Sequence, residues 1–324
     1  MTTDERAALD AVTGALVGVH AGDALGASVE FESWAAIGTT HPNGHRDIVG
    51  GGPFRWRPGA ATDDTDLTLA VAQGYMAHLA TGSDLLRSVA DRMACWWEGD
   101  WPGRRKGTYP KDVGAATARG LRSYRHHGDP TCSGAGQGRA GNGSLMRCIA
   151  TGIVRIDASR RRVESIAISS VTHDDGRCTA ACASYNDAVA ALVDGASPSA
   201  AVDAARRTAA ELANSDVERA IDLGLTLDLG AMAATGHNPL PDHGRGFVLD
   251  SLSLAVASLV DERSFEEVIV DVVRLGGDTD TNAAIAGGLR GSHDGLSAIP
   301  TRWVERLQFR DELRELGALL TSWR

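Results

Sequence analysis

Residues 276–291 read Gly-Gly-Asp-Thr-Asp-Thr-Asn-Ala-Ala-Ile-Ala-Gly-Gly-Leu-Arg-Gly, an acidic cluster that leads into small and apolar residues. Residues 62–66 read Thr-Asp-Asp-Thr-Asp and lead into a similar pattern at Leu67, Leu69, Ala70, Val71 and Tyr75. Apolar side chains that recur at intervals of three and four residues predict a helix with one buried face. The two stretches therefore predict two helices, each of which begins at a group of carboxylates.

The same helical spacing extends over most of the chain, and sustained alternation of period two is rare. No linker rich in Pro, Gly and Ser separates two halves, and no repeat of solenoid length is present. We expect an all-α protein with a single domain over residues 1–324. The expected helices cover residues 5–25, 65–80, 83–98, 113–125, 163–171, 177–194, 199–213, 216–225, 247–260, 264–274, 282–290 and 303–322.

Composition narrows the class of protein. The formal net charge of −10 argues against nucleic acid as a partner attracted by charge. No apolar run is long enough to cross a membrane, and the polar start of the chain does not resemble a signal peptide. Five cysteines without a CxxC pair suit a reducing cytoplasm, and no heptad pattern indicates a coiled coil. We expect a cytoplasmic enzyme that acts as a monomer away from membranes.

The two acidic clusters supply five carboxylates and four hydroxyls, with no Cys or His among them. Oxygen donors of this kind bind hard cations such as Mg²⁺ or Mn²⁺. Helix capping is the competing interpretation, because Ser, Thr and Asp are favoured at helix N-termini. A cap needs one side-chain oxygen, however, and both clusters carry more carboxylates than a cap requires. If folding joins the clusters, they can hold a pair of metal ions.

Several loops also carry candidate site residues. Glu30 ends the segment of residues 18–30, in which small residues permit close backbone approach. The Gly-Asn-Gly loop at 141–143 offers backbone N–H groups to a phosphate. His173 lies in a polar break between two expected helices, where it could be a cap, a core residue or a ligand contact.

Residues 96–105 carry three tryptophans within six positions, at Trp96, Trp97 and Trp101. We expect a lid that its own indoles pack onto the domain. The alternative is a wall beside a leaving-group pocket, in which Glu98 or Asp100 pairs with a guanidinium.

The ordered series of motifs resembles the ADP-ribosylglycohydrolase family. The matching segments are GDALGASVE at 22–30, TDDTD at 62–66, KDVGAAT at 111–117, GNGSLMR at 141–147, THDD at 172–175 and GGDTDTNAAIAGGLRG at 276–291. They cover nearly the whole chain in the family's order. The resemblance implies an orthogonal helical bundle in a single domain, with a binuclear Mg²⁺ or Mn²⁺ centre in a central cleft.

The resemblance also implies roles for individual residues. The implied metal ligands are Thr62, Asp63, Asp64, Asp278, Asp280 and Thr281, with Asp280 between the two ions. Glu30 matches a glutamate implicated in substrate gating or proton transfer, so Glu30 and Asp280 are the expected catalytic pair. The expected substrate-binding residues are Asp23, Asp112, Gly141, Asn142, Gly143, Ser144 and His173. The implied reaction releases ADP-ribose by cleaving its C1″ glycosidic bond to arginine or serine on a protein, or to a small-molecule acceptor.

Three rival functions have weaker support. A terpene cyclase would need a DDxxD-type motif, but Leu67 occupies the position of the last aspartate. It would also need a pocket lined by aromatic side chains, which make up only 5% of this chain. A His-Asp phosphohydrolase could use His173 but would leave both acidic clusters without a role. A non-catalytic ADP-ribose-binding relative would be expected to lose metal ligands, and all six candidates are present here.

Overall fold

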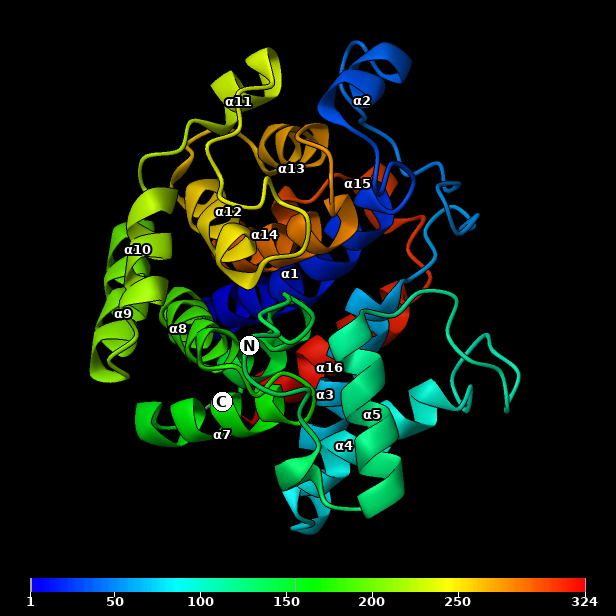
Figure 1. Ribbon diagram of the computed structural model, residues 1–324. Coiled ribbons are helices and arrows are strands. Elements are labelled where there is room, and N and C mark those ends of the chain that lie inside the picture. The colour runs from blue at the N-terminus through cyan, green and yellow to red at the C-terminus, as the bar shows by residue number, and fades with distance from the viewer. Residues whose placement is uncertain (1, 155, 324) are drawn as a thin grey trace.

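The computed structural model describes residues 2–154 and 156–323 (Figure 1). Within these ranges the backbone forms helices and isolated β-bridges without a strand, so the predicted all-α class is confirmed. The longer helices are α1 (Thr3–Gly26), α3 (Asp63–Thr81), α4 (Leu85–Trp97), α5 (Ala115–His127), α7 (Ala158–Ser170), α8 (Gly176–Val193), α9 (Pro198–Glu211), α10 (Ser215–Gly224), α12 (Val248–Val260), α13 (Phe265–Arg274), α14 (Thr279–Asp294) and α16 (Arg310–Ser322).

The short helices are α2 (Trp34–Thr40), α6 (Ile149–Ile153), α11 (Leu229–Thr235), α15 (Thr301–Val304) and the 3-10 turns η1 (Pro130–Cys132), η2 (Leu145–Arg147) and η3 (Leu296–Ala298). Sequence patterning did not predict α2, α6 or α11. The continuous helix expected over 303–322 was wrong. The chain breaks between α15 and α16 because Phe309 is buried there and Gln308 N–H donates to Gly59 O over 2.8 Å.

Glycines bring α1 and α14 into backbone contact at the centre of the molecule (Figure 1). Gly14, Gly18, Gly22 and Gly26 recur every four residues and therefore lie on one face of α1. A Cβ atom at Gly18 would lie 2.2 Å from the carbonyl oxygen of Gly287. No side chain larger than hydrogen fits at such an approach. The antiparallel contact places the acidic start of α14 against the C-terminal end of α1.

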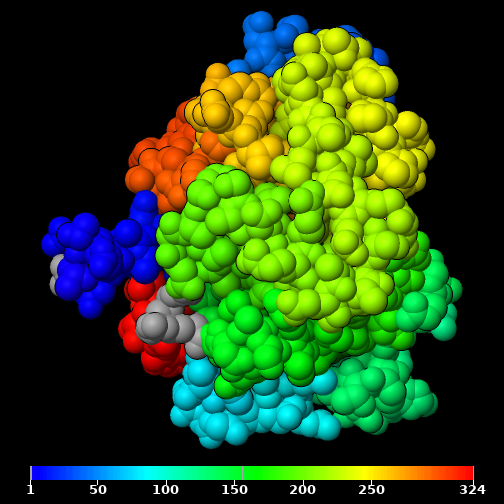
Figure 2. Space-filling view, turned by 90° about the vertical axis from the view of Figure 1, so that its left-hand side faces the viewer, coloured from blue at the N-terminus to red at the C-terminus, as the bar shows by residue number. Residues whose placement is uncertain are grey.

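Buried apolar side chains surround this helix pair in one contiguous cluster that runs from Val12 to Leu320. Helices α8 to α11 cover one face, seen in green to yellow in Figure 2, and the exposed first turn of α1 projects beside it. In the described part of the chain, no helix is both long and apolar enough to cross a membrane. The core therefore fixes α1, α3 and α14 as the scaffold on which the acidic clusters lie.

Candidate metal centre and substrate cleft

Folding brings the two acidic clusters together. Carboxylate oxygens of Asp23, Asp64 and Asp280 lie within 4.8 Å of one another, and all three residues are buried. A second group joins Glu30, Asp278 and Asp280 within the same distance. Asp280 comes from the second cluster and belongs to both groups. It therefore lies next to Asp64 of the first cluster and next to Glu30.

Helix capping does not account for these carboxylates. Thr62 caps α3 through its hydroxyl, which accepts from Asp64 N over 3.3 Å. Asp278 occupies the N-cap position of α14 but its side chain makes no capping hydrogen bond. Instead Asp278 Oδ2 accepts from Asn142 Nδ2 over 2.7 Å. Asp280 Oδ1 does accept from Thr281 N over 2.9 Å, but the clusters still carry more carboxylate oxygens than the helix ends use.

Three buried carboxylate oxygens in this centre lack a hydrogen-bond partner: Asp23 Oδ1, Asp64 Oδ1 and Glu30 Oε2. An unpaired anionic oxygen is costly to bury, and protein interiors satisfy such groups with donors or with metals. The surrounding donors are carboxylates and threonine hydroxyls, which is the ligand chemistry of hard divalent cations. The residues present thus fit the metal centre that the sequence predicted.

Crowding and burial shift the ionisation of these groups. Burial raises the pKa of Glu30 to about 9, and the charges of Asp112, Asp278 and Asp63 add to the shift. Burial together with neighbouring carboxylates holds the pKa values of Asp63, Asp64 and Asp280 well above their usual range. Without a cation the centre cannot carry its full negative charge, so cation binding is coupled to proton release.

Asp23 lies on α1 and is fully buried. Its Oδ2 accepts from Thr62 N over 3.1 Å, from Thr65 N over 3.2 Å and from the Thr65 hydroxyl. It is not among the residues that line the cleft described below. The structure therefore places this predicted substrate-binding residue beneath the metal centre, where it fixes the first turn of α3.

Glu30 is held by a tightly anchored loop after α1. Ser28 Oγ lies 2.7 Å from His45 Nε2, and Phe31 N donates to Gly277 O over 2.8 Å. Phe31 adopts a left-handed backbone conformation, with φ of 64°, and its ring is exposed. A non-glycine residue in this conformation carries local strain, which commonly accompanies functional sites. The loop presents Glu30 to the centre and Phe31 to the cleft.

The glycine loop lies opposite Glu30. It is tied to residues 246–248 because Asn142 N donates to Gly246 O over 2.9 Å and Val248 N donates to Ala140 O over 3.0 Å. Buried Arg147 donates to Gly143 O and, over 2.8 Å, to the hydroxyl of Thr172. The same hydroxyl lies 2.7 Å from His173 Nδ1.

Burial and Arg147 lower the pKa of His173 to about 3, so its imidazole is neutral. Its ring lies beside Gly143, since a Cβ atom built there would be 3.0 Å from His173 Cε1. The structure therefore places His173, an expected substrate-binding residue, against the glycine loop.

A cleft of about 510 Å³ runs over the centre and the glycine loop. The predicted site residues that line it are Glu30, Asp63, Asp112, Gly141, Asn142, Gly143, His173, Asp278, Asp280 and Thr281. Ser144 lies behind the loop, where its hydroxyl accepts from Ser169 Oγ over 2.9 Å. The cleft thus has a carboxylate floor and a wall of backbone amides.

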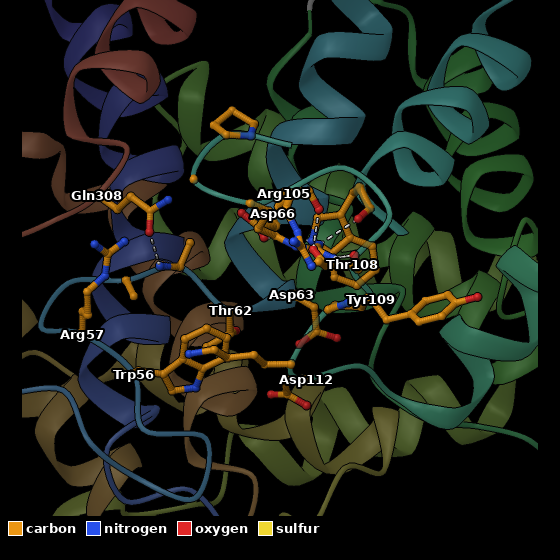
Figure 3. A pocket seen from close by; sticks show the side chains of 18 residues that line it. Trp56, Arg57, Thr62, Asp63, Asp66, Arg105, Thr108, Tyr109, Asp112 and Gln308 are labelled. Atoms are coloured by element: carbon orange, nitrogen blue, oxygen red, sulfur yellow. Dashed lines mark hydrogen bonds between the residues drawn. The ribbon is translucent and has the colours of Figure 1, made fainter. Parts of the chain in front are cut away.

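A second cavity of about 360 Å³ adjoins the cleft (Figure 3). Asp63 and Asp112 line both spaces, and Thr62, Asp66 and Trp56 line the second cavity. Burial and the charge of Asp278 raise the pKa of Asp112 to about 6. The two cavities therefore meet at a pair of carboxylates beside the metal centre.

Indole side chains hold the loop after α4 against α3. Asp66 accepts from Trp96 Nε1 and Trp101 Nε1, each over 2.8 Å. Burial still raises the pKa of Asp66 to about 7 despite these two donors. The tryptophans pack as the sequence predicted, but the last aspartate of residues 62–66 was not expected to anchor them.

Glu98 and Asp100, which the alternative interpretation offered to a guanidinium, both form ion pairs within the chain. Glu98 forms an ion pair with Arg125 at 2.6 Å, and Asp100 forms one with Lys106 at 2.7 Å. Each carboxylate already has a cationic partner from a neighbouring segment, so neither is free for a guanidinium. Within the described ranges, Asp63 and Asp112 line the second cavity without an ion-pair partner from the protein.

Two exposed arginines in the cleft were not predicted. Arg139 precedes the glycine loop and Arg245 lies in the segment tied to it. Asp250 shapes that segment by accepting from Asp242 N over 2.9 Å and from Gly244 N over 3.1 Å. No local pattern marks these arginines, because tertiary contacts alone bring residues 139 and 245 to one cleft.

Comparison with known proteins agrees with the geometry. The family model described as ADP-ribosylglycohydrolase matches residues 4–324. The chain belongs to the ADP-ribosylglycohydrolase family. It is therefore a hydrolase of glycosidic bonds to ADP-ribose, and the resemblance noted from the motifs is confirmed.

Individual relatives extend the match along the whole chain. The ADP-ribosyl-[dinitrogen reductase] glycohydrolase of Rhodospirillum rubrum is 28% identical over 315 residues, with 96% of each chain covered. The ADP-ribosylarginine hydrolase Tri1 of Pseudomonas putida (strain GB-1) is 29% identical over 96% of this chain and 77% of its own. A solved ADP-ribosylglycohydrolase-related protein complex superposes with a TM-score of 0.80 at 29% identity, covering 98% of this chain and 99% of that one.

Proposed function

We propose that this protein removes ADP-ribose from arginine side chains of proteins and requires a pair of divalent cations, Mg²⁺ or Mn²⁺. The observation that carries the proposal is the junction of Asp23, Asp64 and Asp280, whose oxygens lie within 4.8 Å of one another in a buried centre where Asp23 Oδ1 and Asp64 Oδ1 lack a hydrogen-bond partner. Similarity to an ADP-ribosylarginine hydrolase and to an ADP-ribosyl-[dinitrogen reductase] glycohydrolase supports the substrate class.

The ligands for the cations are Thr62, Asp63, Asp64, Asp278, Asp280 and Thr281. Bound cations supply Lewis acidity toward the ribose hydroxyls of the substrate. The chain's own residues supply the remaining recognition of ADP-ribose. Backbone N–H groups of Gly141 and Gly143 and the guanidinium groups of Arg139 and Arg245 are suited to the diphosphate, whereas the Asn142 N–H is used by Gly246 O. His173 packs against Gly143 and keeps the loop in place.

The reaction adds water across the C1″–N bond. The C1″–O bond forms, the C1″–N bond breaks, and the guanidine nitrogen receives a proton. Glu30 lies at the cleft floor with Oε2 unpaired, so it can hold and transfer that proton. Asp280 lies within reach of Glu30 in the same group of oxygens, and we assign the two residues to this shared proton handling.

The acceptor occupies the second cavity. Asp63 and Asp112 stand where the two cavities meet. Because Asp63 is assigned to the cations, the Asp112 carboxylate is the group at that point that suits a positively charged guanidinium. A serine acceptor would bring no charge to this group. This complementarity favours arginine linkage over serine linkage.

The test is release of free ADP-ribose from two matched peptides, one linked through arginine and one through serine, with Mg²⁺ and then with EDTA. We expect chelator-sensitive release from the arginine-linked peptide. Release from the serine-linked peptide alone would overturn the assigned acceptor. Binding of ADP-ribose without release from either peptide would instead indicate a non-catalytic reader.

We also propose that residues 1–324 form one domain, which the contiguous core supports. A monomer in the cytoplasm remains our expectation. Sedimentation of the purified protein tests the monomer directly.

A further inference from the structure

The second cavity has a floor and a rim of opposite charge. Asp63 and Asp112 form its floor, and the exposed cations Arg57, Arg105 and Lys111 form its rim. Figure 3 labels Asp63, Asp112, Arg57 and Arg105. Over the ranges that the structure describes, none of these three cations forms an ion pair with a carboxylate. Lys111 instead lies 5.3 Å above the ring of Trp56.

Neighbouring cations on the same loop are already engaged. Arg104 donates to Trp96 O over 2.7 Å and to Thr108 O over 2.6 Å, and Lys106 pairs with Asp100. Those two side chains fix the loop. Arg57, Arg105 and Lys111 come from two separate segments and have no carboxylate partner in the described ranges, although Lys111 lies over the ring of Trp56. A ligand that enters the cavity can therefore pair with them.

We propose that this rim selects acceptor peptides in which acidic residues flank the modified arginine. This inference rests on the proposed function and adds the sequence preference of its substrate. The acidic floor accepts the guanidinium, and the cations around it face the neighbouring residues of the peptide. In a peptide with Asp or Glu beside the arginine, the guanidinium pairs with the acidic floor and the flanking carboxylate pairs with the rim cations. A peptide with basic flanking residues would be repelled by the rim cations.

An acidic peptide fits the rim better than a nucleic acid does. Three rim cations surround a carboxylate floor, and the chain as a whole carries a net charge of −10. The negative charge of the whole protein would repel a nucleic acid, and three rim cations are too few to offset this repulsion. A short acidic flank reaches only the rim.

The experiment compares kcat/KM for three arginine-linked peptides with acidic, uncharged and basic flanks. At low salt we expect the acidic peptide to exceed the uncharged one by about 3- to 20-fold, since exposed ion pairs are individually weak. The advantage should shrink as salt rises, because exposed charges are screened. It should also vanish in the triple variant Arg57→Ala, Arg105→Ala, Lys111→Ala.

The inhibition constant of free ADP-ribose separates this rim from the ADP-ribose site. It should stay unchanged in the triple variant, whereas Arg245→Ala should weaken ADP-ribose inhibition and keep the flank preference. The matched control is Arg207→Ala, Arg314→Ala, which removes exposed cations from α9 and α16 and should keep both properties.

Equal kcat/KM for all three flanks would overturn the inference and leave the proposed function standing. So would weaker ADP-ribose inhibition in the triple variant, because the rim would then serve the diphosphate. Faster release from an ADP-ribosylated oligonucleotide than from the acidic peptide would also overturn it. Absence of release from every arginine-linked peptide would count against the proposed function itself.

Discussion

The hydroxyl of Thr281 donates to Asp64 Oδ2 over 3.4 Å, although 217 positions separate the two residues. The same oxygen accepts from Thr62 Oγ1 over 3.0 Å. One carboxylate is thus shared by hydroxyls from both acidic clusters. Neither cluster forms this arrangement alone, because it depends on the contact of α1 with α14 and on the packing of α3 beside them.

Asp280→Asn should lower metal-dependent turnover by about 100-fold or more, because it removes a charged ligand common to both groups of oxygens. The metal-free variant should be at least as stable as the parent, since the substitution relieves repulsion among buried carboxylates. Activity and thermal unfolding in EDTA check both parts. Asp203→Asn, at an exposed position on α9, is the control. Full activity in Asp280→Asn would contradict the ligand assignment.

Glu30→Gln should reduce kcat by about 10²- to 10⁴-fold, the usual contribution of a general acid or base. The amide keeps the shape of the side chain, so affinity for ADP-ribose should change little. Steady-state kinetics and calorimetric binding of ADP-ribose separate these effects. Equal losses in kcat and in affinity would make Glu30 a binding residue.

Stability of the metal-free protein should fall as pH rises from about 7 to 9. The folded pKa of Glu30 is raised to about 9, so this carboxyl binds more protons in the native state than in the unfolded chain in this window. The buried imidazoles of His20, His45 and His173, whose lowered pKa values give the opposite slope below about pH 6.5, are neutral in both states there. Unfolding then becomes easier with rising pH. Added Mg²⁺ should therefore raise Tm more at about pH 9 than at about pH 7. The check is a Tm series with and without Mg²⁺, and a flat metal-free series would refute the coupling.

Gly18→Ala should destabilise the fold by about 1–3 kcal/mol or more, because its Cβ would lie 2.2 Å from Gly287 O and the two helix backbones would have to separate. Loss of metal affinity should accompany the loss of stability, since the same contact positions Asp280. Gly176→Ala is the control, as the nearest neighbour of its Cβ lies 4.0 Å away. Denaturant unfolding measures both variants.

Most of the helices could be predicted from the helical spacing of apolar residues in the sequence. Helices α3 and α14 begin at the two acidic clusters as expected, because their apolar faces follow directly. The break before α16 escaped detection since the apolar residues around Phe309 continue a helical pattern, and only the tertiary contact of Gln308 with Gly59 interrupts it. Local periodicity carries no information about such a contact.

Most of the carboxylates that the structure brings together at the candidate site were named from the sequence, whereas their surroundings were not. Carboxylates crowded at the starts of two helices indicate a cation site from their ligand chemistry alone. The anchoring of Thr62 and Thr65 by Asp23 could not be anticipated, because it depends on the closeness of α1 to α3. Likewise, residues 57, 105 and 111 become one rim only when the second cavity forms.

The most direct test of the central claim is anomalous diffraction from a crystal of this protein grown with Mn²⁺. We expect two manganese peaks, one beside Asp63 and Asp64 and one beside Asp278 and Thr281, with Asp280 next to both. Absence of manganese from the carboxylate centre, or its binding only at other carboxylates, would rule out the proposed metal site.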